Sequence, residues 1–249
     1  MTNKIVDSDT GTMTGEGMSD GSIPGTFSIV ARDPDADAIG VAISTALLGV
    51  GAVCPHVGPD GAVAVQSFSR ATQGQQVISL LDNGHTISDA IATVLEDDQH
   101  AGYRQMHGVD SAGNRDSFTG EDCVEWCGSV FGEQHSVAGN MLKHGDVISK
   151  MSDAFEDADG CLSERLLTAL QTGQAAGGDK RGKISAAILV HSSSPKLYHN
   201  LRVDFADDPV QRLAETYSQA RQTEATMESS FTELLGEYPD ELLQFGVKD

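Results

Sequence analysis

The stretch Gly25-Thr26-Phe27-Ser28-Ile29-Val30-Ala31-Arg32-Asp33 joins a leader without aromatic residues to a run that is typical of a β-strand. The leader, residues 1–25, is rich in Gly, Thr, Ser, Asp and Met, and this composition predicts a disordered or removable segment. If the bond before Thr26 is broken, the new α-amine titrates near pH ~8 and can accept the proton of the threonine hydroxyl. The alternative is an ordinary first strand behind a tail, since strands favour threonine.

The composition bounds the class of protein. A chain of 249 residues is long enough for one large domain with a core of its own. The formal net charge is −21, from 37 acidic and 16 basic residues. Such a surface suits a high-salt cytoplasm, where screening weakens the self-repulsion. It argues against nucleic acid as a partner because phosphates would be repelled.

Neither a membrane segment nor a metal motif stands out in the sequence. No apolar run reaches the roughly 18 residues that span a bilayer, and no signal peptide opens the chain. We therefore expect a cytoplasmic protein without a membrane partner. Cys123 and Cys127 could supply two metal ligands, but no second pair with zinc-site spacing follows. We favour structural thiols and predict that the protein needs no metal and no cofactor.

The periodicity of apolar residues predicts an α+β protein. Strands alternate with pairs of helices along the body of the chain, an order that suits two sheets between two helical layers. We predict strands at 26–31, 39–46, 61–67, 103–109, 115–118, 136–139, 184–190 and 198–203. We divide the chain into the leader 1–25, a domain at 26–210, and a C-terminal helical extension at 211–249 that packs on the domain.

A glycine-rich loop carries the second chemical signal. It reads Gly177-Gly178-Asp179-Lys180-Arg181-Gly182, and its glycines permit close approach of the backbone to another group. Asp179 could cap backbone amides or orient a base, and Arg181 could hold a carboxylate through two parallel hydrogen bonds. A connection whose charged side chains are merely solvated fits the sequence equally well.

Other polar residues at the ends of predicted strands are weaker candidates. Asn140 could donate to an oxyanion, although an asparagine in a left-handed turn fits the same position. If the sheet edges frame a cleft, four further side chains would line it: Ser44, Thr45, Gln66 and Ser67. Three histidines lie near predicted strand ends, with surface or core positions as the default: His56, His107 and His135. No phosphate-binding loop, zinc-protease helix or serine-hydrolase elbow is present.

Taken in order, several segments resemble the uncharacterised family catalogued as domain of unknown function 1028 (DUF1028), placed in the N-terminal-nucleophile (Ntn) hydrolase superfamily. The matching segments are Thr26–Asp33, Gly40–Ala52, Gly61–Gln66, Trp126-Cys127-Gly128, Ala138-Gly139-Asn140, Gln174–Gly182, Ser185-Ala186-Ala187 and Leu201-Arg202-Val203-Asp204. The resemblance implies a four-layer αββα sandwich and hydrolysis of amide-type bonds with Thr26 as nucleophile. Family members often begin Met-Thr, whereas 25 residues precede the threonine here.

The function that we expect is an Ntn-type amidohydrolase acting on a small molecule. Thr26 attacks the carbonyl, Asn140 and backbone amides near the glycine loop hold the oxyanion, and Asp179 and Arg181 position the nucleophile or a substrate carboxylate. Ser44, Thr45, Gln66, Ser67, Gly177 and Gly178 would contact the substrate. Two alternatives stay open: a non-catalytic metabolite-binding or regulatory protein on the same scaffold, and a metal-dependent enzyme. By analogy with the superfamily we expect a homo-oligomer.

Overall fold

A computed structural model describes residues 25–235 of the chain. The predicted leader before Gly25 and the part of the helical extension after Leu235 lie outside the described residues. The described part is a mixed α+β structure with five α-helices and two antiparallel sheets. One sheet has six strands in the order β10-β9-β2-β1-β8-β7, and the other has four in the order β3-β4-β5-β6.

The strands of the larger sheet are β1 (Thr26–Asp33), β2 (Ala38–Thr45), β7 (Gly128–Phe131), β8 (His135–Asn140), β9 (Ser185–Ser192) and β10 (Asn200–Val203). Those of the smaller sheet are β3 (Pro55–Gly58), β4 (Gly61–Ser67), β5 (Arg104–Asp110) and β6 (Arg115–Thr119). The helices are α1 (Ala71–Asp82), α2 (Ile87–Glu96), α3 (Asp146–Asp157), α4 (Leu162–Ala175) and α5 (Pro209–Leu235).

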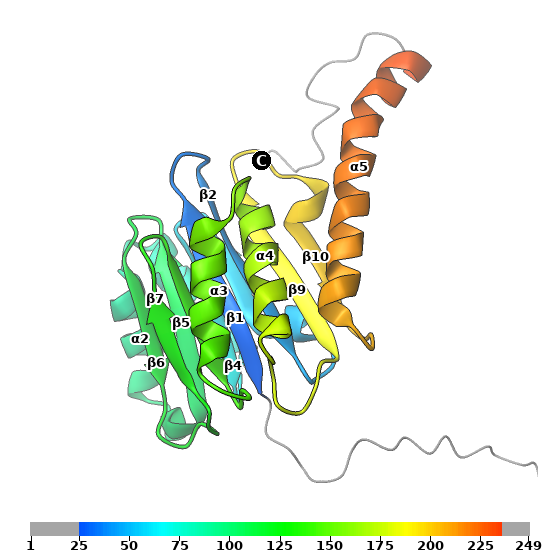
Figure 1. The fold of residues 1–249 in the computed structure, drawn as a ribbon. Helices are drawn as coiled ribbons and strands as arrows, with labels where there is room; N and C mark the ends of the chain where they lie inside the picture. Colours follow the sequence, from blue (N-terminus) through cyan, green and yellow to red (C-terminus); the bar gives the residue numbers. More distant parts are fainter. Residues whose placement is uncertain (1–24, 236–249) are drawn as a thin grey trace, which may run out of the picture.

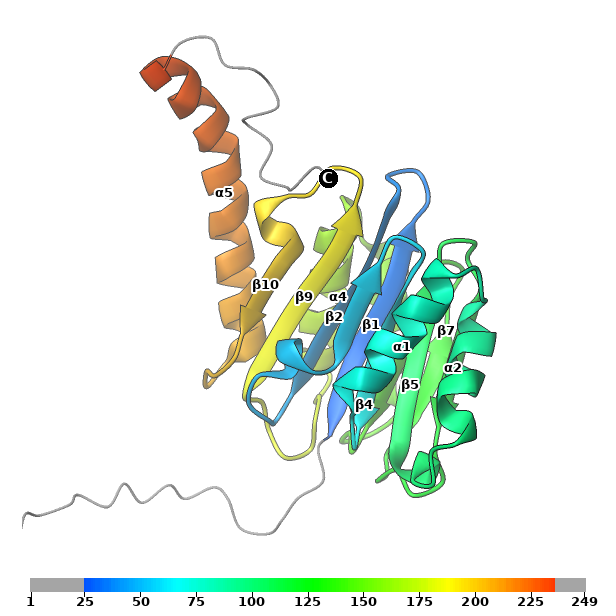
Figure 2. The same cartoon turned by 180° about the vertical axis from the view of Figure 1, so that it is seen from behind.

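Alternation along β1 explains how the elements stack. Phe27 and Ile29 are fully buried in a core that they share with residues of α3 and α4, whereas Val30 belongs to a second core between the two sheets. On the far side of the smaller sheet, α1 and α2 cover a third core that includes Val65 and Met106. Figures 1 and 2 show α3 and α4 on one side of the larger sheet and α1 and α2 on the opposite side of the molecule.

The position of β1 sets the geometry of the candidate site. It pairs with β2 on one side and β8 on the other, so Thr26 lies opposite Thr45 in one neighbour and opposite Asn140 in the other. The turn after β1 is closed by Asp33, whose carboxylate accepts the amides of residues 35 and 36 at 3.1 and 3.2 Å. The three residues Thr26, Thr45 and Asn140 therefore meet at the opposite end of the sheet from this turn (Figure 1).

The strand and helix order follows the sequence prediction, with three local differences. The short strands β3 and β7 were not predicted, because Pro55-His56-Val57-Gly58 and Gly128-Ser129-Val130-Phe131 carry too little apolar alternation to signal a strand. Helix α4 continues to Ala175, whereas we expected the loop that ends at Gly182 to begin already at Gln174. The predicted domain boundary after residue 210 falls inside the first turn of α5.

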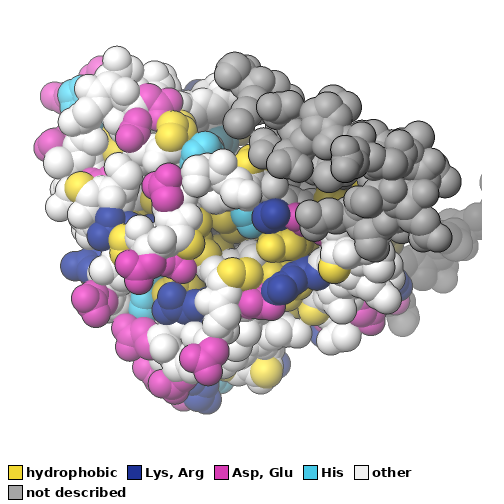
Figure 3. Space-filling model, turned by 90° about the horizontal axis from the view of Figure 1, so that it is seen from above, with side chains coloured by type: hydrophobic (Ala, Val, Ile, Leu, Met, Phe, Trp, Pro, Cys, Tyr) yellow, Lys and Arg dark blue, Asp and Glu magenta, His cyan; other side chains and the backbone are white. Residues whose placement is uncertain are grey.

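The surface carries charges of both signs. Figure 3 looks down on the end that holds the turn between β1 and β2, where acidic side chains lie around the margin and apolar side chains near the centre. Between residues 25 and 235, no helix is both long enough and apolar enough to cross a membrane.

Candidate functional site

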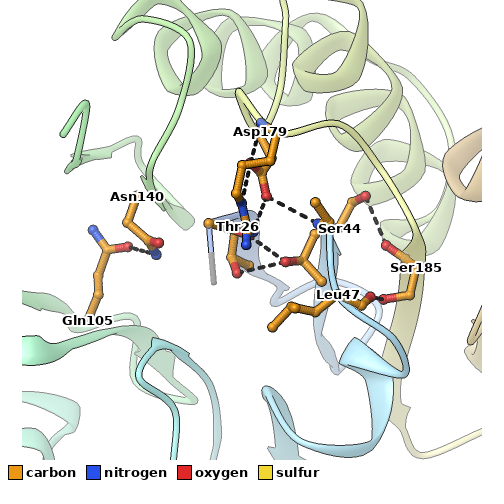
Figure 4. Close-up of polar contacts among 11 residues, drawn as sticks. Thr26, Ser44, Leu47, Gln105, Asn140, Asp179 and Ser185 are labelled. Carbon is orange, nitrogen blue, oxygen red and sulfur yellow. Dashed lines mark hydrogen bonds and ion pairs between the residues drawn. The ribbon is translucent and has the colours of Figure 1, made fainter. Parts of the chain in front are cut away.

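Thr26 is the first residue of β1, and its side chain is directed between the two sheets. The residue is 1% exposed, and its Oγ1 donates to Oγ1 of Thr45 at 3.3 Å. The Thr45 hydroxyl in turn donates to the carbonyl oxygen of Gly25. The two threonines and the peptide bond that precedes Thr26 therefore form one hydrogen-bonded group (Figure 4).

An ion pair from the glycine-rich loop completes this group. The Asp179 side chain is fully buried, and its Oδ2 lies 2.5 Å from Nη2 of Arg181. Asp179 also accepts the amide of Ala46 at 3.1 Å and the amide of Arg181 at 2.9 Å. Arg181 Nη2 donates to the Gly25 carbonyl at 3.1 Å. A guanidinium held by a buried carboxylate thus polarises the carbonyl adjacent to Thr26.

The space around Gly25 is too small for a side chain. A Cβ added there would lie 2.7 Å from Cβ of Met141 and 3.0 Å from Cγ of Asp179. The Met141 backbone is held by its amide, which donates to the Val124 carbonyl at 2.8 Å, and by its carbonyl, which accepts the Lys180 amide at 3.0 Å. The position before Thr26 therefore requires glycine in this conformation.

Asn140 lies on the other side of Thr26 and belongs to a buried amide network. Its Nδ2 donates at 2.9 Å to Oε1 of Gln105, which also accepts from Nε2 of Gln66 at 2.7 Å. Gln105 Nε2 donates to the Gly139 carbonyl at 2.9 Å, and this bond fixes which end of the Gln105 amide accepts. Asn140 Oδ1 is buried without a hydrogen-bond partner among the described residues. It is Met141, not Asn140, that adopts a left-handed conformation, with φ of 51°.

The network continues between the sheets through two serines and a histidine. Ser28 Oγ donates to Oε1 of Gln66 at 2.7 Å and lies 2.7 Å from Nε2 of His107, whose Nδ1 is 3.0 Å from Ser136 Oγ. Burial lowers the pKa of His107 to about 3, against the opposing effect of its hydrogen bond with Ser136. His107 is therefore a neutral core residue at physiological pH.

The other two histidines lie away from Thr26. His56 packs against Gly74 and hydrogen-bonds with the carbonyl of Val53, and burial lowers its pKa. His135 Nε2 lies 2.8 Å from Oγ of Ser152, and burial is the main cause that lowers its pKa to about 4. Neither ring takes part in the hydrogen bonds around Thr26.

The structure brings together six of the ten predicted site residues: Thr26, Thr45, Gln66, Asn140, Asp179 and Arg181. Ser44 is not among them, because alternation turns its hydroxyl to the other face of β2, where it donates to the Ser185 carbonyl at 3.0 Å. Ser67 ends β4 opposite Arg104 on the face that alternates away from Gln66. Their roles in substrate binding stay predictions without support from this geometry.

The first two glycines of the loop, Gly177 and Gly178, turn the chain rather than face Thr26. Gly177 and Gly178 have φ of 123° and 53°, which favours glycine, and a Cβ on Gly178 would lie 2.9 Å from the Phe27 ring. Their amides donate to the carbonyls of Gln174 and Gly173. Because both amides already donate within the chain, the roles of Gly177 and Gly178 in substrate binding stay predictions without support from this geometry.

Gln105 and Ser28 are site residues that sequence reasoning missed, and His107, expected at a surface or core position, lies in the core beside them. Each is a fully buried polar residue in a strand. Gln105 and His107 are two residues apart in β5, with the apolar Met106 between them, so the two polar side chains share one face of the strand. This alternation was the available signal for a polar layer between the sheets.

Neither a metal-binding cluster nor a deep cavity in residues 25–235 indicates a second candidate site. In residues 25–235, no group of three or more His, Cys, Asp or Glu residues could hold a metal ion. Burial raises the pKa of the Cys54 thiol to about 11 and also raises the pKa values of Cys123 and Cys127. Two surface depressions of about 570 and 670 Å³ are lined by α5 and by the residues around the end of β10, away from Thr26.

Comparison with known proteins identifies the family. The family model described as a family of unknown function (DUF1028) matches residues 26–213. The chain belongs to the DUF1028 family. A crystal structure of a DUF1028 protein from Silicibacter pomeroyi shares 34% identity with it, with a TM-score of 0.74, over 79% of this chain and 86% of the other. No curated protein matches the chain. The DUF1028 match begins at Thr26, the residue at the centre of the candidate site.

Proposed function

We propose that this protein is an amidohydrolase that cleaves a C–N bond in a small molecule, with Thr26 as an N-terminal nucleophile once residues 1–25 have been removed. The fold would then be a four-layer αββα sandwich of the Ntn type. The observation that carries the proposal is the convergence on Thr26 of the Thr45 hydroxyl at 3.3 Å and of the Asp179–Arg181 pair, which reaches the carbonyl directly before it.

The proposed reaction uses the chain's own groups. The Thr26 hydroxyl attacks the carbonyl carbon of the amide while the α-amine takes its proton and passes it to the leaving nitrogen. The amine product departs, and an ester joins the acyl group to Thr26. Water, deprotonated by the same amine, attacks the ester and releases a carboxylate. A threonine hydroxyl is a weak nucleophile without such a base, so the reaction requires the free α-amine.

Asn140 has a defined place in this scheme. One N–H group of its Nδ2 donates to Gln105, and the second N–H group is available to donate to the oxyanion. Cross-strand partners have Cβ atoms about 4.5–5.5 Å apart, so Asn140 lies within reach of a group bound to Thr26. Asp179 acts through Arg181, because its carboxylate holds the guanidinium in one orientation.

The test begins with the intact mass of protein purified under native high-salt conditions. A dominant species that begins at Thr26 supports the proposal, and an amide panel is then screened with wild type, Thr26→Ser and Thr26→Ala. We expect Ser to retain measurable turnover and Ala to lose it. Equal turnover by wild type and Thr26→Ala would refute the mechanism. A chain that stays full-length after long incubation would favour the alternative, a metabolite-binding protein.

The proposal also covers the cellular location and the oligomeric state of the protein. All four cysteines are free, which supports a cytoplasmic location because that compartment keeps thiols reduced. We also propose a homo-oligomer by analogy with the superfamily, and light scattering at several concentrations tests this directly. Nucleic acid and membranes are not proposed as partners.

A further inference from the structure

The peptide that precedes Thr26 occupies the site in the way that an acyl group would. The Gly25 carbonyl oxygen accepts from the hydroxyl of Thr45 and from Nη2 of Arg181 at 3.1 Å. A hydroxyl and a guanidinium aimed at one amide oxygen are donors of the kind that stabilise negative charge developing on that oxygen. The Gly25 oxygen therefore marks a subsite for the oxygen of a bound acyl group.

The guanidinium in this subsite is held in place. The Arg181 side chain is 17% exposed, and Asp179 accepts from its Nε at 3.1 Å as well as from Nη2 at 2.5 Å. Asp179 itself forms a backbone bridge with Leu142, next to Met141. The ion pair holds the Arg181 guanidinium on Asp179, and the backbone bridge holds Asp179 in place. The position of the oxygen subsite therefore does not depend on a flexible side chain.

The wall beside the Gly25 Cα limits what the subsite accepts. An L-configured Cβ would approach Met141 Cβ to 2.7 Å and Asp179 Cγ to 3.0 Å. Both atoms lie close to backbone that is hydrogen-bonded on both sides, so neither can withdraw as the end of a long side chain would. Only hydrogen fits at this position without displacing the wall.

We propose that the Gly25 site is the acyl subsite of the hydrolase proposed above, on which this inference rests, and that it takes acyl groups with an unbranched α-carbon, –CH2–CO–. An L-configured substituent on that carbon is rejected. The carboxylate product of such a substrate places one oxygen between Thr45 and Arg181. The chain's own Gly25 fills the same position, so the uncut protein is blocked against such ligands.

The direct test measures binding rather than turnover. A protein that begins at Thr26 is titrated calorimetrically with N-acetylglycine and with N-acetyl-L-alanine, two carboxylates that differ by one methyl group. The family match starts at residue 26 and every described strand and helix lies at or beyond it, and circular dichroism checks that the protein is folded. We expect N-acetylglycine to bind at least about tenfold more tightly, the size of effect that overpacking produces.

Three variants test the atoms of the subsite one by one. Met141→Gly removes the closest wall atom at a position whose φ of 51° suits glycine, and should strengthen binding of the alanine probe at least about threefold. Thr45→Val removes the hydroxyl donor, and Arg181→Lys replaces the planar guanidinium by an ammonium group. Each change should weaken the binding of N-acetylglycine about tenfold. Thr168→Val, an exposed change on α4, is the matched control and should leave both affinities unchanged.

The outcomes separate the two proposals. Equal affinity for the two probes, or no binding of either by the folded protein that begins at Thr26, overturns the subsite. Binding of N-acetylglycine by uncut protein as tight as by cut protein also overturns it, because Gly25 then does not occupy the site. Selective binding of N-acetylglycine without turnover of any amide supports the subsite and refutes the proposed hydrolase activity. Equal turnover of glycyl and L-alanyl amides supports the hydrolase activity and refutes the proposed specificity of the subsite.

Discussion

Replacement of Gln105 should lower the free energy of unfolding strongly, because its side chain joins the buried amide network beside Thr26. Its amide accepts from Gln66 and Asn140 at 2.7 and 2.9 Å, and donates to the Gly139 carbonyl and to Thr119 at 2.9 Å each. In Gln105→Leu, a leucine of similar volume fills the space, but two buried amide groups and a buried carbonyl lose their partner. Each such loss costs about 1–3 kcal/mol.

The expected loss is smaller than a simple sum because the groups belong to one network. We expect about 3–6 kcal/mol of unfolding free energy, which is about 6–24 °C in Tm for a domain of this size. Guanidinium unfolding, followed by the fluorescence of the single tryptophan, Trp126, measures it. Gln76→Leu, the same change on the exposed face of α1, should stay within about 0.5 kcal/mol of wild type.

A Gln105→Leu protein within about 1 kcal/mol of wild type would refute this account of the network. It would mean that Asn140 and Gln66 find other acceptors, or water, as soon as the amide is removed. The orientation that we assign to Asn140 would then lose its physical basis. A large loss in Gln76→Leu as well would instead point to a general effect of adding leucine.

Three further predictions follow from single contacts. His107 has a folded-state pKa of about 3 against an ordinary 6.5, so as pH falls below about 6.5 only the unfolded chain gains this proton. Stability should therefore fall by up to about 1.4 kcal/mol per pH unit from this residue, and unfolding of His107→Gln across pH 4–7 should show a flatter slope. Gly108→Ala would bring a Cβ to 2.5 Å from the carbonyl oxygen of Ala62 in the neighbouring strand, and should lower the free energy of unfolding by about 1–3 kcal/mol in urea titrations. Asp98 and Arg104 form an ion pair at 2.8 Å with side chains 5% and 8% exposed, so Asp98→Ala should cost about 3–5 kcal/mol, and a thermal melt that stays unchanged would contradict the buried pair.

The elements that could be predicted are those with strong periodicity and capping. Helix α2 is an example: Thr86 stands three residues before Asp89 at the start of an apolar-periodic run, a spacing typical of an N-cap, and in the structure Thr86 accepts the Asp89 amide at 3.2 Å. The strands next to Thr26 were visible as buried apolar runs. By contrast, β3 and β7 are held by their neighbours rather than by their own composition, so single-sequence patterns gave no warning of them.

The candidate site was predictable only in part because its residues were sought at strand ends rather than on strand faces. Ser44 and Thr45 are adjacent in sequence, yet only Thr45 faces Thr26, since successive side chains in a strand point to opposite sides. Gln105 lies on the second sheet, and its contact with Asn140 depends on how the two sheets stack. No local pattern in the sequence carries that information.

The sequence separations around Thr26 also bear on how the chain is made. Thr45 follows Thr26 by only 19 residues, whereas Arg181 lies 156 residues beyond Gly25. Closing the longer loop costs about 1.9 kcal/mol more chain entropy. At a synthesis rate of 5–20 residues per second, Arg181 leaves the ribosome roughly 8–30 seconds after Gly25. A nascent or prematurely terminated chain that stops before Arg181 therefore holds the Gly25–Thr26 peptide without the guanidinium that contacts its carbonyl in the folded domain.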